Sequence, residues 1–282
     1  MMKEGARAVM ALRVHHITNI HQPDLEPYRT LKRPIDHQKQ GIFIAEGEKV
    51  VRRLAESLLH IRSILLTQEW FTIYEPLLRS RSEDIDVYIA NKDLMETIVG
   101  YPLHKGIMAL GEIPERATIA KVVAEIDRPF LFAAVDGIMN SENLGVIVRN
   151  CASFGVQAIL VGETSCDPYL RRAVRNSMGN VFVLPIVQLS NIANELSLLR
   201  LSHGIKLIAA HPREGSKDMR MVNLAGDCCV VFGSEGNGIS EGVLGVCDES
   251  VTIPMMNGVD SINVGSASAV LLYEARRQRS FP

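Results

Sequence analysis

The stretch Phe130-Leu-Phe-Ala-Ala-Val135, followed directly by Asp136-Gly-Ile-Met-Asn-Ser-Glu-Asn-Leu-Gly145, determines the fold that we predict for the second half of the chain. Six consecutive apolar residues are typical of a β-strand that is covered on both faces, as in a parallel sheet. The polar loop after them leads into a helix that we expect over 146–154. Because α/β sheets expose their ligand sites at the carboxyl ends of strands, this loop is a candidate site. Asn143 could instead be the N-cap of the helix.

Apolar runs of the same kind follow on the C-terminal side, and helical patterns separate most of them. We expect the further strands at 158–161, 181–184, 206–210, 228–232 and 250–253. Strands that alternate with helices favour a mostly parallel sheet with right-handed crossover connections. The sequence therefore predicts an α/β domain in this half of the chain.

The first hundred residues also alternate between strand and helix patterns. The expected strands are 41–45, 61–66, 85–89 and 106–110, and the expected helices are 46–59, 69–81 and 92–99. Between 112 and 129 the apolar runs stop, apart from a short helical pattern at 119–126. With 282 residues the chain is long enough for two medium domains. We predict an N-terminal domain over 1–113, a linker over 114–128 and a second domain over 129–282.

A glycine-rich loop, Phe232-Gly-Ser-Glu-Gly-Asn-Gly238, follows the strand expected at 228–232. Its glycines read G-x-x-G-x-G, whereas a dinucleotide-binding loop reads G-x-G-x-x-G and is followed about 20 residues later by an acidic ribose-binding residue. Both differences disfavour a nicotinamide-dependent oxidoreductase. Glu235 is then either a functional group at the strand end or a solvated side chain in a tight turn.

A third polar loop, Ile253-Pro-Met-Met-Asn-Gly-Val-Asp-Ser261-Ile-Asn263, precedes a helix of small residues that we expect over 265–274. Its amides and hydroxyls could bond to an adenosine or a ribose, because a few convergent polar groups give a small-molecule site its specificity. Ser261 or Asn263 could also be no more than the N-cap of the helix.

Together and in this order, the three loops resemble the SpoU (TrmH-like) branch of the SPOUT methyltransferases. The family motifs are D-x-x-x-[ND]-P-x-N-x-G-x-x-x-R, G-S-E-G-x-G and I-P-M-x-G-x-x-x-S-L-N-V, and the match runs from about Phe130 to Arg279. The first half is similar, more loosely, to the L30e-like RNA-binding domain of two-domain members, through Phe43-Ile-Ala-Glu-Gly47 and His104-Lys-Gly-Ile-Met-Ala109. The resemblance implies an α/β trefoil-knot catalytic domain preceded by a smaller α/β substrate-binding domain, and a homodimer.

The resemblance also implies an activity, the transfer of a methyl group from S-adenosyl-L-methionine to a ribose 2'-hydroxyl of RNA. The residues that it places at the reaction centre are Asn143, Arg149, Glu235, Ser261 and Asn263. Those that it places on the cofactor are Gly233, Ile253 and Ile262. A guanidinium with a pKa above about 12 is a poor base. We therefore expect the arginine to hold a phosphate and orient the hydroxyl.

Ribosomal RNA is the favoured substrate, because a separate N-terminal domain suits a structured target, and transfer RNA is the alternative. A knotted RNA-binding or ribosome-assembly factor without activity is a further alternative, which the retained motif residues disfavour. Arg171, Arg172 and Arg175 could contact phosphates or form a solvated helix face.

This chain departs from the family pattern at three positions. Ser141 stands where proline is common, Ile262 replaces leucine, and Gly265 stands where serine is usual. The first change removes a fixed φ from the loop, and the other two alter the packing. None of the three removes a reacting group.

Composition restricts the classes of protein to which the chain can belong. The net charge of −2 excludes a basic coat for nucleic acid but leaves local arginine clusters. Five cysteines without a C-x-x-C pair indicate neither a disulfide framework nor a zinc site, and we interpret Cys228 and Cys229 as core residues. No apolar stretch approaches a membrane helix and no signal peptide is evident, so we expect a cytoplasmic protein that requires no metal.

Overall fold

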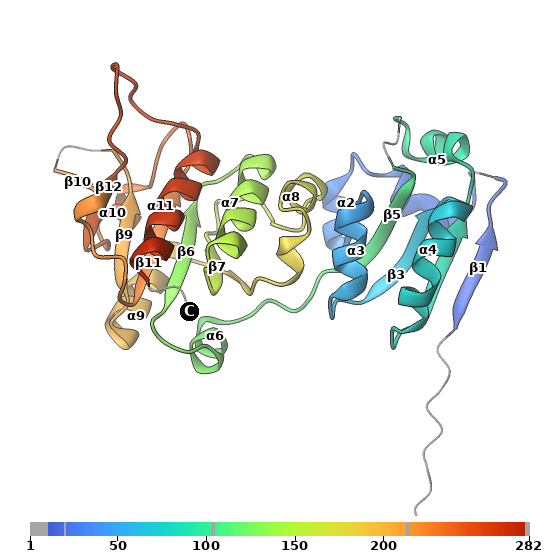
Figure 1. Cartoon of the computed structure of the whole chain (residues 1–282), viewed down its shortest axis with the longest axis horizontal. Coiled ribbons are helices and arrows are strands. Elements are labelled where there is room, and N and C mark those ends of the chain that lie inside the picture. The colour runs from blue at the N-terminus through green and yellow to red at the C-terminus, as the bar shows by residue number, and fades with distance from the viewer. Residues whose placement is uncertain (1–10, 20, 103–104, 213–214, 280–282) are drawn as a thin grey trace, which may run out of the picture. The chain divides into compact units, whose positions relative to one another are not determined.

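The computed structural model describes residues 11–19, 21–102, 105–212 and 215–279. The chain divides into two compact units, Met1–Pro114 and Glu115–Pro282, each built on its own sheet (Figure 1). Part of the segment that we expected to be a linker forms helix α6 (Ile119–Glu125), and Val122 of this helix is buried in the core of the second unit. The second unit thus begins before residue 129.

The first unit contains a mixed five-stranded sheet in the order β1-β4-β3-β5-β2. Strands β1, β4 and β3 are parallel to one another, whereas β5 is antiparallel to both of its neighbours. The strands are β1 (Leu12–His16), β2 (Ile42–Glu46), β3 (Ile61–Leu66), β4 (Ile85–Ile89) and β5 (Ile107–Glu112). The helices are α1 (Glu26–Arg29), α2 (Pro34–Lys39), α3 (Glu48–Glu56), α4 (Gln68–Arg79) and α5 (Lys92–Val99). The four strands and three helices that we predicted here are confirmed, with small shifts at their ends. His104, in the motif quoted above, lies outside the described residues.

Strand β1 and the short helices α1 and α2 are elements of this unit that the sequence pattern did not predict. The strand lies at the sheet edge, and four of its five side chains are exposed, so it lacks the apolar alternation of a half-buried strand. Polar contacts hold it instead: Arg13 Nε donates to Asp86 on β4 at 2.8 Å, and His15 Nε2 lies 3.0 Å from the same carboxylate. The Arg13 guanidinium, together with His15, holds the pKa of Asp86 below its ordinary value.

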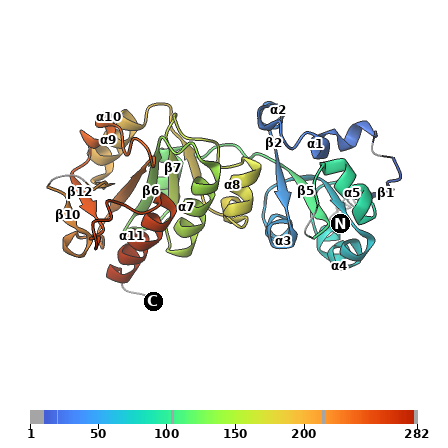
Figure 2. The ribbon, with the colours of Figure 1, turned by 90° about the horizontal axis from the view of Figure 1, so that it is seen from above.

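Helices cover both faces of this sheet (Figure 2). One face packs with α1 and α5 around buried residues such as Tyr28, Leu65 and Met95. The other face packs against α3 and α4, whose apolar side chains recur at helical spacing, as Val50, Val51 and Leu54 do on α3.

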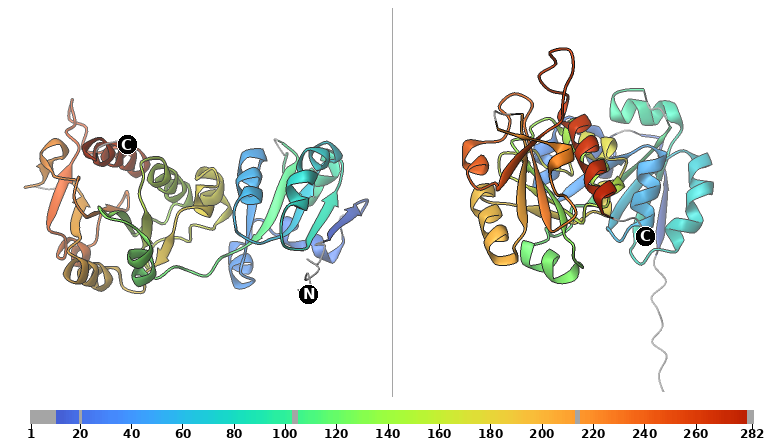
Figure 3. Two further views of the ribbon diagram at one scale, coloured as in Figure 1. Left: turned by 60° about the horizontal axis from the view of Figure 1, so that its bottom comes forward. Right: turned by 60° about the vertical axis from the view of Figure 1, so that its left-hand side comes forward.

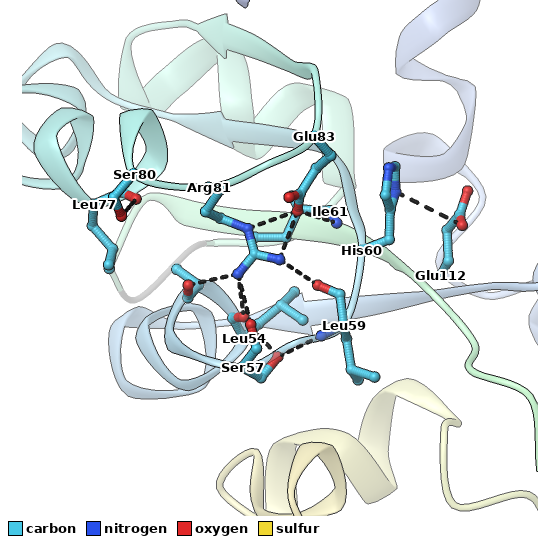
Figure 4. A network of polar contacts seen from close by, with 11 residues as sticks. Leu54, Ser57, Leu59, His60, Ile61, Leu77, Ser80, Arg81, Glu83 and Glu112 are labelled. Carbon is cyan, nitrogen blue, oxygen red and sulfur yellow. Dashed lines mark hydrogen bonds and ion pairs between the residues drawn. The ribbon is translucent and has the colours of Figure 1, made fainter. Parts of the chain in front are cut away.

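Arg81, in the loop between α4 and β4, is the centre of a polar network that joins three parts of the first unit (Figure 4). Its guanidinium donates to the carbonyl oxygens of Ala55 (2.7 Å), Ser57 (2.8 Å) and Leu59 (2.5 Å), at and beyond the end of α3. Its Nε donates to Glu83 Oε1 at 2.6 Å, and both side chains are nearly buried, with exposures of 8% and 11%. The network satisfies carbonyls that the end of α3 leaves without helical partners.

The second unit contains a seven-stranded sheet in the order β10-β12-β9-β11-β6-β7-β8, and every neighbouring pair in it is parallel. The strands are β6 (Leu131–Asp136), β7 (Ala158–Val161), β8 (Ile186–Gln188), β9 (Lys206–Ala210), β10 (Lys217–Asp218), β11 (Cys228–Gly233) and β12 (Glu249–Thr252). The helices after α6 are α7 (Ser141–Ser153), α8 (Arg171–Asn176), α9 (Ile192–His203), α10 (Glu241–Leu244) and α11 (Val264–Gln278). The predicted parallel α/β sheet is confirmed. The trefoil knot that the resemblance implies stays a prediction.

Alternate residues of the central strands face opposite layers. Phe132 and Val231 point to a core that α6, α9 and α10 cover. Helices α7 and α11 cover the other face and lie side by side, α11 in red and α7 in green in Figure 3. Cys228 and Cys229 are buried in β11, as expected of small core residues.

Two local predictions are wrong. The apolar run at 181–184 is not a strand: Asn180–Phe182 form a 3-10 helix, and the strand β8 starts after Pro185. The proline separates the two, since it cannot donate to a sheet ladder. The helix of the first motif starts at Ser141, five residues earlier than predicted, because Asn140 caps it by accepting from the backbone N–H of Glu142 at 2.8 Å.

Candidate active site

A cavity of about 550 Å³ lies in the second unit, at the carboxyl ends of three neighbouring strands. Because β12, β9 and β11 are adjacent and parallel, the loops that follow them meet at one edge of the sheet. The walls of the cavity come from 210–212 after β9, 232–238 at the end of β11 and beyond it, and 251–253 at the end of β12. Residues 260–264, before and at the start of α11, complete it.

Six of the eight predicted site residues line this cavity. They are Gly233, Glu235, Ile253, Ser261, Ile262 and Asn263. The three residues that we expected to hold a cofactor and three of those expected at the reaction centre thus line the same cavity. Asn143 and Arg149, on α7, are not among the lining residues.

Asn263 connects the three motifs. Its side-chain amide Nδ2 donates to Asn143 Oδ1 at 3.1 Å and also to Glu235 Oε1. Its other end, Oδ1, accepts the backbone N–H of Gly265 at 2.8 Å and so caps α11. The capping interpretation of Asn263 is therefore correct, and its role in the reaction stays a prediction that this position at the cavity wall allows. Ser261 does not cap the helix.

Asn143 is not the cap of α7, because Asn140 takes that position. Asn143 is the third residue of the helix, and its side-chain oxygen is used for the bond from Asn263. The structure thus corrects the capping interpretation and places this amide next to the cavity wall.

Arg149 is exposed on α7, six residues after Asn143. Six residues correspond to a rotation of about 240° around the helix axis, so the two side chains leave α7 in different directions. In the part of the chain that the structure describes, the Arg149 guanidinium has no ion-pair partner. The structure therefore does not bring Arg149 to the cavity of its own chain.

Arg172, in the neighbouring helix α8, pairs with Glu142 across 3.6 Å, and both side chains are more than half exposed. A solvent-exposed ion pair of this kind is weak, so the pair leaves the arginine available to a phosphate.

The glycine-rich loop folds back on itself. Ser234 and Gly238 exchange two backbone hydrogen bonds, of 2.9 and 3.0 Å, which makes a tight turn with Glu235 at its exposed tip. A Cβ at Gly233 would lie 2.2 Å from the carbonyl carbon of Gly238, so only glycine allows this approach. The tight-turn interpretation is correct, and the turn presents its carboxylate to the cavity.

Asp136 also helps to build the site, although we predicted no role for it. It is 4% exposed, and its Oδ2 accepts the backbone N–H of Ser240 at 2.8 Å, which ties the first motif to the end of the second. Its position as the polar residue that ends the otherwise apolar β6 strand was the signal that could have identified it.

His211 also lines the cavity, beside Gly238, where a Cβ would come within 3.1 Å of the imidazole. No motif in the sequence pointed to this residue.

Close helix packing holds the first and third motifs together. A Cβ at Gly265 would lie 2.8 Å from Val146 Cγ1, so the glycine that replaces the usual serine lets α11 approach α7. Across the same contact, Asn150 Nδ2 donates to the carbonyl of Gly265 at 2.7 Å and to Ser268 Oγ at 2.9 Å. The small residues at the start of α11 thus serve packing within the chain.

Two further observations concern the described residues only. They contain no group of three or more His, Cys, Asp or Glu side chains arranged to hold a metal ion. None of the helices they form is both long enough and apolar enough to span a bilayer.

Comparison with known proteins gives a consistent result. Residues 131–273 match the model of the SpoU rRNA Methylase family. The chain is 32% identical to an uncharacterised tRNA/rRNA methyltransferase of Mycobacterium tuberculosis, over 98% of this chain and 97% of that protein. It is 31% identical to the 23S rRNA (guanosine-2'-O-)-methyltransferase RlmB of Vibrio parahaemolyticus, over 62% of this chain and 71% of that protein.

Among solved structures, the fold is similar to that of the SpoU methyltransferase AviRb from Streptomyces viridochromogenes in complex with AdoMet. The TM-score is 0.79 at 22% identity, and the similarity covers 91% of this chain and 98% of that one. The two-unit architecture, a mixed five-stranded sheet followed by a parallel SpoU sheet, is therefore shared. From the family match and the full-length relative together, this chain is an enzyme that belongs to the SpoU rRNA methylase family.

Proposed function

We propose that this enzyme transfers a methyl group from S-adenosyl-L-methionine to a ribose 2'-hydroxyl of ribosomal RNA. The observation that carries the proposal is the junction of Asn143, Glu235 and Asn263 at the wall of the 550 Å³ cavity. Family membership supports the reaction type, and RlmB, a relative, is named for 2'-O-methylation of guanosine in 23S rRNA.

The cavity suits S-adenosyl-L-methionine in size and in chemistry. Its volume lies in the range of small-molecule sites, about 300–1,000 Å³. Apolar groups such as Ile262 and Leu271 offer a surface for an adenine, while Glu235 and Asp260 offer negative charge to a cationic cofactor. AdoMet is also present in the structure of AviRb. Gly233, Ile253 and Ile262 would hold the cofactor through their backbone groups, and the bound cofactor supplies an electrophilic methyl group.

The residues of the chain then have to position and activate the hydroxyl. Asn263 fixes the carboxylate of Glu235 through a hydrogen bond, so the carboxylate is held ready to accept a hydrogen bond from the 2'-hydroxyl. Asn143 holds the amide of Asn263 in turn, and Ser261 offers a further hydroxyl at the same wall. Fixed orientation of reacting groups can supply much of the rate enhancement in a transfer of this kind.

Arg149 has a different place in the proposal. It is exposed and does not line the cavity of its own chain, which suits a cation that grips an RNA phosphate at the site of a second copy. The homodimer that the resemblance implies would supply that second copy. Arg149→Lys tests this role, since near-normal turnover with unchanged RNA affinity would contradict it.

Ribosomal RNA is the proposed substrate class, and tRNA is the alternative, because the full-length relative is named for both. An inactive RNA-binding factor is the second candidate function, and the intact junction around Asn263 argues against it. We propose that the reaction takes place in the cytoplasm and without a metal.

The test is transfer of tritium from methyl-labelled S-adenosyl-L-methionine to total RNA from cells that lack the gene. We expect label in ribosomal RNA, at one position that loses its 2'-O-methyl group in the deletion strain. Label in the tRNA fraction alone would refute the rRNA assignment. The absence of label from every fraction, with RNA binding intact, would support the inactive-factor alternative.

A further inference from the structure

The first unit carries a groove of about 750 Å³ that the proposed reaction does not use. Four segments line it: 16–18 at and after the end of β1, 67–70 at the start of α4, 89–92 between β4 and α5, and 105–106 before β5. Because β1, β4 and β3 are parallel neighbours, the groove lies at their common carboxyl edge. Such an edge is where α/β sheets usually bind ligands.

Trp70 lines the groove, and its indole ring is fixed in position. Its Nε1–H donates to the carbonyl oxygen of Lys105, and its ring packs edge to face against Tyr74 with the centroids 6.0 Å apart. The ring is only partly buried. A fixed, partly exposed indole is a suitable stacking surface for a nucleobase, because every base has a π-face.

The same groove offers positive charge and free donors. Lys92 and Lys105 line it, and both residues are exposed. Lys92 also pairs with Glu96 at 3.8 Å, and a long, solvent-exposed pair of this kind is weak enough to give way to a phosphate. At the start of α4, Thr67 is the N-cap residue, yet its hydroxyl accepts no hydrogen bond from the first turn. The first backbone N–H groups of α4 therefore remain available to an anion, and the helix dipole favours one there.

The α5 side of the groove is different, because Asn91 caps that helix by accepting the N–H of Leu94 at 2.8 Å. Glu69, in the first turn of α4, is the one carboxylate among the lining residues, and it is exposed. It opposes an anion at this helix end, so its replacement by glutamine should strengthen anion binding.

We infer that this groove binds an unpaired nucleotide of the RNA substrate, with the base on Trp70 and a phosphate near the start of α4 and the two lysines. The inference rests on the proposed function, since the occupant is taken to be RNA. An aromatic surface beside cations favours a nucleotide over an acidic peptide, which has no base to stack.

Tryptophan fluorescence can test this inference directly, because Trp70 is the only tryptophan in the chain. The full chain, without cofactor, is titrated with a single-stranded RNA decamer while the tryptophan fluorescence is recorded. We expect saturable quenching by the RNA. Polyglutamate of equal charge should leave the signal unchanged, and equal quenching by polyglutamate would overturn the inference.

Variants are compared by the anisotropy of a labelled decamer. Trp70→Leu should weaken binding by roughly 5- to 100-fold, and Trp70→Phe, which keeps a ring, should weaken it much less. Lys92→Gln with Lys105→Gln should make the log–log salt dependence shallower by about 1.4, since each phosphate contact on a single strand contributes about 0.7.

The matched control is Lys32→Gln with Lys39→Gln, two exposed lysines of the same unit outside the groove, and it should leave the slope unchanged. The Lys92/Lys105 variant retains Trp70, so its fluorescence also shows that the unit is folded.

Methyl transfer is measured on the same variants, which separates this inference from the proposed function. If Trp70→Leu binds the decamer as tightly as the unmodified chain, the groove inference is wrong, whether or not methyl transfer occurs. If the RNA quenches Trp70 and the variants bind weakly while no RNA accepts label, the groove inference stands and the proposed function fails.

Discussion

Replacement of Arg81 by methionine should destabilise the first unit by about 3 kcal/mol. Methionine keeps most of the aliphatic length but removes every donor of the guanidinium. Glu83 then keeps the N–H of Ile61, at 3.1 Å, but loses its charged partner, and three carbonyls around the end of α3 lose theirs.

The magnitude follows from the burial of the pair. Removal of one partner from a buried ion pair costs about 3–5 kcal/mol, because the remaining charge is left without compensation. The exposures of 8% for Arg81 and 11% for Glu83 let some water reach the carboxylate, so we expect the lower end of this range. A loss of about 3 kcal/mol changes the unfolding equilibrium by roughly 150-fold.

Urea unfolding followed by the fluorescence of Trp70 measures this loss, since the single tryptophan lies in the same unit. With an m-value of about 1.5 kcal/mol/M, the midpoint should fall by about 2 M urea. The control is Arg79→Met, which breaks an exposed pair with Glu75 and should cost less than about 0.5 kcal/mol. Equal midpoints for the Arg81 and Arg79 variants would refute the reasoning.

The pH dependence gives an independent check. Burial by itself raises the pKa of Glu83, but the hydrogen bonds from Arg81 and from the Ile61 N–H outweigh it, and the pKa lies below its ordinary value of 4.5. A lowered carboxyl pKa stabilises the folded state above the pKa of the unfolded chain and loses that effect as the pH falls through the folded pKa. The unmodified chain should thus keep this stabilisation from pH 7 downward and lose it as the pH falls below 4.5, so its difference from Arg81→Met is largest near pH 7 and shrinks as the pH falls.

Three other predictions concern the second unit. Asn263→Ala should lower kcat/KM for methyl transfer on the order of 100-fold, because the bond that holds Glu235 is lost. The control is Asn257→Gly, which should be fully active: Asn257 lies in the same loop but outside the cavity lining, and glycine tolerates its φ of 57°. Gly233→Ala should abolish cofactor binding in a calorimetric titration, because its Cβ would lie 2.2 Å from the backbone at Gly238; normal affinity would show that the turn can open without loss. Ser141→Pro should raise the thermal stability by about 0.5–1 kcal/mol in calorimetry, because Ser141 is the first residue of α7 and Asn140 before it is extended, with φ −79° and ψ 109°; a lower melting temperature would contradict this.

The parallel sheet could be predicted from the sequence because its strands are long apolar runs, of which 131–136 and 228–233 are the clearest. The short strand β8 could not, since it has three residues and a more apolar run precedes it. Edge strand β1 was not predicted because polar bonds from Arg13 and His15 to Asp86, 73 and 71 residues away in sequence, stabilise it.

The candidate site was predictable as a set of loops. The resemblance to the SpoU family grouped Gly233, Ile253 and Ile262, and all three line one cavity at the edge where the carboxyl ends of parallel strands meet. The bond between Asn263 and Asn143 joins residues 120 positions apart, and no local pattern encodes it. The same is true of the bond from Ser240 to Asp136, and of the direction in which Arg149 leaves α7.

The side chain of Asn263 makes a hydrogen bond at each end of its amide, and these bonds restrict where the loop before α11 can change in length. The oxygen caps the last helix, and the nitrogen donates to the carboxylate of Glu235 in the glycine-rich turn. One planar amide therefore fixes the position of this carboxylate relative to the start of the helix. An insertion within residues 256–259, which are exposed and lie outside the cavity lining, should change only the length of that stretch. One residue inserted between Asn263 and Gly265 would separate the helix start from the carboxylate. The number of residues between this asparagine and the helix is therefore fixed, whereas the length of the rest of the loop is not.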